Sequence, residues 1–178
     1  MPKHASQGFS SSASVPVGYN PDDRQFSPAP PRLTPMPIQV LFHNSEAVRN
    51  CEVQRMKKAI RSIAGDYGWT DGDISIALMS DSEIRELNSK HLSHDYATDV
   101  ISFDLSNNDD FLEGEIIASV ETADREAVEH GWQGDDELLL YVIHGMLHIV
   151  GLGDKKTKEK KIMRDAERHY LGLFHLST

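Results

Sequence analysis

Two histidines one helical turn apart, followed by a glycine-rich turn, form the part of the sequence best suited to chemistry. His144 and His148 are four residues apart, which places both imidazoles on the same face of a helix. Gly151 can end that helix, and Gly153 with Asp154 can turn the chain back toward the imidazoles. This spacing predicts a metal site formed by a helix and the turn after it, with His144, His148 and Asp154 as ligands.

Three protein ligands leave the fourth tetrahedral position of a zinc ion open, as in catalytic zinc sites. Zn²⁺ in such a site lowers the pKa of a water in that position to about 7, which makes a hydroxide nucleophile available at neutral pH. The alternative is a pair of core histidines, each hydrogen-bonded to a backbone carbonyl. The offsets of Gly151 and Asp154, and the apolar segment around the pair, favour the metal site.

The residue after the first histidine restricts the reaction. The spacing overlaps the pattern of a class of zinc proteases, which place a glutamate general base immediately after their first histidine. This chain has Gly145 at that position, and glycine cannot transfer a proton. Peptide hydrolysis by that mechanism is therefore not expected.

The segment that carries the histidines should be a buried helix. It begins near Asp135 or Asp136, because acidic residues suit a helix N-terminus. Apolar residues then follow nearly all round it: Leu138, Leu139, Val142, Ile143, Met146, Leu147 and Ile149. A helix with this pattern lies in the centre of a domain, where a histidine needs a polar partner.

Apolar periodicity also predicts the elements that must position this helix. Strands are expected at 38–42, 74–78, 100–103 and 115–120, and further helices at 52–67, at about 81–87, at 122–130 and at about 158–173. Polar residues 88–98 should form a loop. This order indicates an α+β fold, a mixed four-stranded sheet packed with about five helices, with the metal site on the central buried helix.

The chain divides into a tail and one domain. Residues 1–36 are rich in serine and proline and lack apolar periodicity, so we expect a disordered tail. Residues 37–178 are long enough for a single domain, which we expect to be a metal-dependent hydrolase.

Composition indicates the cellular compartment of this domain. Cys51 is the single cysteine, which excludes an intrachain disulfide and a thiolate-rich zinc site and is typical of a reducing compartment such as the cytoplasm. No apolar run approaches the ~20 residues needed to span a bilayer, so no membrane partner is expected. The sequence does not indicate an oligomeric state.

Charge is distributed unevenly. The formal net charge of −10 argues against nonspecific binding to a polyanion. However, seven of the 18 Lys and Arg residues lie between Lys155 and Arg168, directly after the candidate metal site. This basic segment is either a wall that binds phosphate groups or an ordinary solvated helix face.

Several segments together resemble one known family. They are His144-Gly145-Met146-Leu147-His148 with its glycine turn, Glu86-Leu87-Asn88, the Ala-Thr-Asp-Val-Ile-Ser-Phe run at 97–103, Gly114-Glu115-Ile116-Ile117, and Glu137-Leu138. Across roughly residues 38–170 the chain resembles the YbeY-type rRNA maturation endoribonucleases. The resemblance implies a zinc-dependent single-strand endoribonuclease in 16S rRNA 3′-end maturation and ribosome quality control. It also implies rRNA and the small ribosomal subunit as partners.

Two positions depart from that family. Its usual third ligand is a histidine, whereas this chain has Asp154, whose carboxylate is also an acceptable zinc ligand but would alter metal preference. The family's functionally important arginine is matched by Leu92, which cannot contact a phosphate. We therefore carry no role over to Leu92 and consider His91, His94 and Lys155 as candidate substrate contacts.

Two other functions remain open on the sequence alone. One is a hydrolase of another class, such as a peptidase whose base comes from another segment, for example Glu115. The other is a nonenzymatic ribosome-assembly factor with a structural metal, suggested by the missing arginine.

Overall fold

The computed structural model describes residues 37–46, 49–91 and 98–177, with the side chains of 88–91 excepted. Leu92, His94 and the expected tail at 1–36 lie outside the described residues. The predictions made for them stay predictions.

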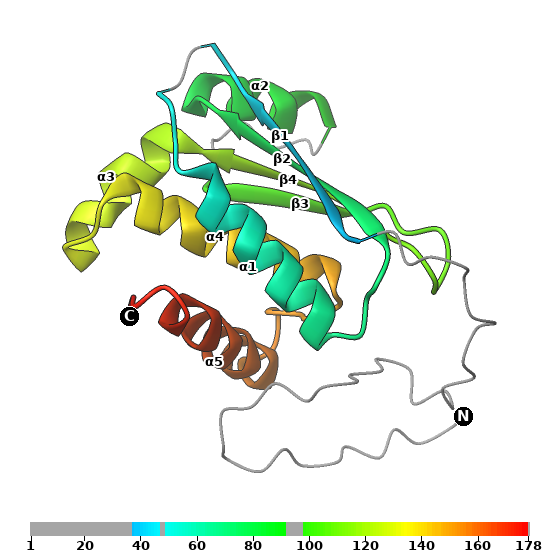
Figure 1. Cartoon of the computed structure of the whole chain (residues 1–178). Helices are drawn as coiled ribbons and strands as arrows, with labels where there is room; N and C mark the ends of the chain where they lie inside the picture. Colours follow the sequence, from blue (N-terminus) through cyan, green and yellow to red (C-terminus); the bar gives the residue numbers. More distant parts are fainter. Residues whose placement is uncertain (1–36, 47–48, 92–97, 178) are drawn as a thin grey trace.

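Within the described residues, four strands and five helices follow one another in the expected order, which confirms the α+β class (Figure 1). The strands are β1 (Gln39–Asn44), β2 (Gly72–Met79), β3 (Val100–Asp104) and β4 (Leu112–Ser119). The helices are α1 (Val53–Asp66), α2 (Asp81–His91), α3 (Val120–His130), α4 (Gly134–Ile149) and α5 (Thr157–Gly172). No helix in this part of the chain combines the length and apolar character needed to cross a membrane.

Two boundaries differ from the expected ones for local reasons. Ser119 caps α3, because its hydroxyl accepts a hydrogen bond from the Thr122 amide at 3.1 Å, so β4 ends there and Val120 is helical. Residues 88–91, which were expected to lie in a loop, belong to α2, because this helix continues to His91.

The sheet has the order β1-β2-β4-β3 and is mixed, as predicted. β1, β2 and β4 are parallel, and β3 is antiparallel to β4. Figure 1 shows α2 on one face of the sheet and α1 and α4 on the other. Alternation along β4 divides its side chains between these faces: Ile116 joins the main core, and Ile117 joins a smaller cluster with Ile84 of α2.

Charged residues hold the N-terminus of α4. The Asp136 carboxylate accepts a hydrogen bond from the Gln133 amide at 3.1 Å, which closes a capping box. Arg55 of α1 pairs with Asp136 at 2.7 Å, and Arg49 pairs with Asp135 at 2.5 Å. The acidic start predicted for this helix is thus tied to α1 and to the segment before it.

Helix α4 packs closely on the sheet at two positions, where a glycine of one element contacts an isoleucine of the other. A Cβ on Gly145 would lie 3.1 Å from Ile116 Cγ2, and a Cβ on Gly114 of β4 would lie 2.8 Å from Ile149 Cδ1. Each glycine therefore leaves room for the isoleucine side chain of the opposite element to pack against it. Gly145, the residue that stands where the zinc proteases have their glutamate base, faces the sheet.

We expect Gly145→Ala to lower the free energy of unfolding by about 1–3 kcal/mol, because the added methyl overpacks a buried contact. Ile116 has little room to move, since it is fully buried on a strand paired on both sides. Urea unfolding followed by circular dichroism measures the change.

The matched control is Gly65→Ala near the end of α1, where a Cβ meets nothing within 4 Å. This variant should be about 0.4–1 kcal/mol more stable than the wild type, because alanine restricts the unfolded chain. Equal effects at both positions would contradict the close contact of α4 with the sheet.

Candidate metal centre

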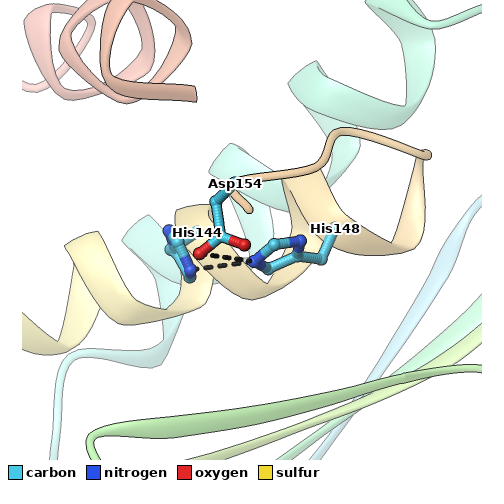
Figure 2. Close-up of side chains that lie close together, drawn as sticks. All are labelled: His144, His148 and Asp154. Atoms are coloured by element: carbon cyan, nitrogen blue, oxygen red, sulfur yellow. Dashed lines mark hydrogen bonds and ion pairs between the residues drawn. The ribbon is translucent and has the colours of Figure 1, made fainter. Parts of the chain in front are cut away.

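The three predicted ligands lie together at the C-terminal end of α4. The Nε2 atoms of His144 and His148 are 3.0 Å apart, and Asp154 Oδ2 lies 3.9 Å from His148 Nε2. Figure 2 shows the Asp154 carboxylate above the two imidazoles, on the turn that follows the helix. One ligand atom from each residue lies within 4.8 Å of the others, so this cluster could hold a metal ion.

The turn that brings Asp154 back is a Schellman motif. The Gly151 amide donates to the His148 carbonyl, and the Leu152 amide donates to the Leu147 carbonyl, both at 2.9 Å. Gly151 has a φ of 100°, a conformation that side chains rarely adopt. The glycine expected to end the helix therefore does so, and it supplies the reversal that the third ligand requires.

Both imidazoles are held through their Nδ1 atoms. His148 Nδ1 lies 2.8 Å from the Leu152 carbonyl oxygen, and His144 Nδ1 lies 2.6 Å from Glu167 Oε1. A carbonyl oxygen can only accept, so His148 Nδ1 carries the proton. The carboxylate of Glu167 likewise accepts from His144 Nδ1 when it is ionised.

With a proton on each Nδ1, a neutral imidazole presents a bare lone pair at Nε2. The two Nε2 atoms face each other at 3.0 Å, where a bound cation or a shared proton must lie between them. Metal-binding histidines are held in this way, with Nδ1–H donated to a carboxylate or a carbonyl. A pair of core histidines would account for the Nδ1 contacts, but its Nε2 atoms would approach to 3.0 Å only with a proton shared between them.

Negative charge surrounds His144. Burial lowers the pKa of its imidazole, but the hydrogen bond and charge of Glu167, with the charges of Asp99 and Asp154, raise it more, so the net pKa is above the ordinary value. The same charges favour a bound cation. Two imidazoles and a carboxylate are a donor set that zinc accepts, so the residues present suit the metal.

Glu167 is the contact that sequence reasoning missed. It lies on α5 between Met163 and Tyr170, both of which are buried. An acid four residues after Met163 and three before Tyr170 falls on the buried side of an amphipathic helix. A carboxylate on the buried side of a helix needs a polar partner, and this pattern in the sequence could have pointed to Glu167.

Of the other candidate residues, His91 and Lys155 lie in the described part of the chain, whereas His94 lies outside it. His91 is the last residue of α2, its side chain is not described, and α2 packs on the sheet face opposite α4. Lys155 follows Asp154 and is exposed.

Glu115 cannot be the base of a peptidase at this centre. Its neighbours on β4, Gly114 and Ile116, both contact residues of α4. Because side chains alternate along a strand, Glu115 points to the opposite face of the sheet. This corrects the suggestion that Glu115 could supply a proton-transfer group here.

Glu167→Gln should weaken zinc binding by about 10–100-fold, because a neutral amide no longer holds the Nδ1 proton of His144 as a carboxylate does. Competition with a chromogenic chelator measures the affinity. Asp165→Asn is the matched control, since Asp165 is on the same helix but pairs with Arg168. Unchanged affinity in Glu167→Gln would show that this carboxylate does not support the centre.

Comparisons with known proteins agree on one family. The family model described as Endoribonuclease YbeY matches residues 40–175. Endoribonuclease YbeY of Bacteroides thetaiotaomicron is 35% identical over 133 residues, which are 74% of this chain and 96% of that protein. The Phocaeicola vulgatus protein of the same name is 33% identical over 139 residues, 77% of this chain and 100% of that protein.

A solved structure has the same fold. It is the solution structure of TM1509 from Thermotoga maritima, with a TM-score of 0.55 and 24% sequence identity over 77% of this chain and 92% of that chain.

Proposed function

Because the chain belongs to the endoribonuclease YbeY family, we propose that it is a zinc-dependent single-strand endoribonuclease of 16S rRNA 3′-end maturation and ribosome quality control. The observation that carries the proposal is the convergence of the His144 and His148 Nε2 atoms beside the Asp154 carboxylate. One zinc ion per chain is held by these three residues.

Zinc bound there supplies Lewis-acid chemistry toward a phosphodiester. The chain's own residues keep the centre ready for it. Glu167 and the Leu152 carbonyl hold a proton on Nδ1 of each imidazole, which keeps Nε2 free and fixes the direction of each ring. The Schellman turn holds Asp154 on the same side.

The three proposed ligands are partly accessible to solvent. The exposed fractions of the His144, His148 and Asp154 side chains are 26%, 28% and 44%. Gly145 contributes no proton-transfer group and faces the sheet, which supports RNA over a peptide as the substrate. Lys155, directly after Asp154, is proposed as a substrate contact, with His91 and His94 as further candidates.

The wider setting follows from the family. We propose residues 37–178 as a single hydrolase domain, supported by the family match over 40–175. rRNA and the small ribosomal subunit are its proposed partners, and the cytoplasm is its proposed location.

The direct test compares RNA with protein as substrate. Purified protein is incubated with a precursor fragment of the 16S rRNA 3′ end and, separately, with casein. We expect RNA cleavage that a chelator abolishes and added zinc restores, with casein intact. Cleavage of casein alone would indicate a peptidase, and RNA binding without cleavage would indicate an assembly factor. In cells that lack the protein, mapping of rRNA 3′ ends should reveal unprocessed 16S ends.

A further inference from the structure

The start of α5 and the turn before it concentrate cations that lack acidic partners. The side chains of Lys155, Lys158, Lys160, Lys161 and Arg164 are exposed and form no ion pair within the described part of the chain. Lys156 and Arg168 differ, because they pair with Glu159 and Asp165. In a chain of net charge −10, this is a strong local excess of positive charge.

Two of these cations lie on the side of α5 that reaches the metal centre. Lys160, Arg164 and Glu167 have the spacing i, i+4, i+7, so they share one face of the helix. Glu167 on this face contacts His144 at 2.6 Å. With a rise of 1.5 Å per residue, Arg164 lies about 4.5 Å and Lys160 about 10 Å along the axis from Glu167.

The segment that carries these cations lies between two residues of the metal centre, Asp154 and Glu167. Asp154 stands three residues before α5 begins, and Glu167 contacts His144 from within α5. Figure 1 shows α5 returning past α4 after the turn. Lys155, Lys160 and Arg164 therefore lie on the segment that joins Asp154 to Glu167. We call Lys160 and Arg164 of α5, together with Lys155 of the turn before it, the α5 basic face.

Negative charge at the metal centre opposes the binding of RNA, and the α5 basic face can offset it. Asp99, Asp154 and Glu167 all act on His144, and they would repel a polyanion even after a divalent cation had neutralised part of their charge. Exposed Lys and Arg beside the centre offset that repulsion and can bind phosphate groups of any sequence.

We propose that the α5 basic face binds backbone phosphates of single-stranded RNA next to the metal centre. This inference rests on the proposed ribonuclease function. It adds Lys160 and Arg164 as substrate-binding residues and assigns their contact to the phosphates, not to the bases.

The test measures binding of a short fluorescein-labelled single-stranded RNA by anisotropy, with a chelator present to prevent cleavage, over a series of salt concentrations. Lys160→Gln and Arg164→Gln should each raise Kd roughly fivefold and reduce the salt slope by about 0.7 for each lost phosphate contact. In cleavage assays with zinc, KM should rise while kcat and zinc content stay unchanged.

Lys158→Gln is the matched control, because it removes the same charge from the same helix. It lies two residues before Lys160, which places it on the opposite side of α5. Its Kd should stay within about twofold of the wild-type value.

Four outcomes would overturn the inference. Equal increases of Kd in Lys158→Gln and Lys160→Gln would indicate that RNA binding depends only on the overall charge of the protein. If the wild type binds and cleaves RNA but Lys160→Gln and Arg164→Gln have unchanged Kd, the basic face does not bind RNA. The proposed function would then still hold. A wild type that neither binds nor cleaves RNA would remove both. Phosphatidylserine vesicles are a parallel arm, and capture by vesicles in place of RNA would assign the face to a membrane surface.

Discussion

The double variant His144→Ala, His148→Ala is expected to lose the proposed zinc site and, with it, the cleavage of RNA. Both Nε2 ligand atoms disappear, and Asp154 alone cannot hold the ion. A metal ion contributes several kcal/mol of transition-state stabilisation, so the cleavage rate should fall by at least about 10³-fold. Elemental analysis after dialysis gives the zinc content, and a labelled RNA gives the rate.

The matched control is the double variant His43→Ala, His169→Ala. His43 is exposed on β1, and the His169 ring meets the Tyr170 ring edge to face with centroids 5.0 Å apart. Neither belongs to the cluster that could hold a metal ion. This variant should keep one zinc ion per chain and full activity. Circular dichroism should show that both variants are folded, because His144 and His148 are partly exposed. Full zinc content in His144→Ala, His148→Ala would refute the site assignment.

The second large effect is expected at Asp154, the proposed third ligand. Asp154→Ala should reduce zinc affinity by more than about 100-fold, because removal of a ligand costs at least as much as loss of a residue that orients one. Asp154→Asn keeps the shape and removes the charge, so it should also bind zinc weakly. Chelator competition measures all three proteins.

Asp154→His separates the identity of the ligand from its position. It restores a third imidazole, a donor that zinc accepts equally well, and its affinity should stay within about tenfold of the wild-type value. The test is clean because Asp154 is 44% exposed and lies in a turn held by backbone hydrogen bonds. Wild-type affinity in Asp154→Ala would mean that two histidines and another group hold the metal.

Much of this arrangement could be predicted because its causes are local in sequence. The apolar residues around 138–149 indicate a central helix, and α4 is that helix. The i, i+4 spacing of the histidines places them on one face, and Gly151 marks the reversal by its left-handed backbone. Segments of alternating and helical periodicity gave the α+β class and the order of elements.

Other features depend on which elements pack together, and no local pattern reports that. Glu167 reaches His144 from 23 residues away because α5 folds back beside α4. Glu115 is excluded from the centre by its register on β4, and Gly145 proves to be the point where α4 approaches Ile116.

Adjacent residues are therefore enough to predict the helix, its two histidines and the turn that returns Asp154. The contact of His148 Nδ1 with the Leu152 carbonyl is equally local, since it spans four residues within that helix and turn. The proton on His144 Nδ1 and the side of α5 that faces the centre depend instead on long-range packing, because Glu167 contacts His144 only once α5 has packed beside α4.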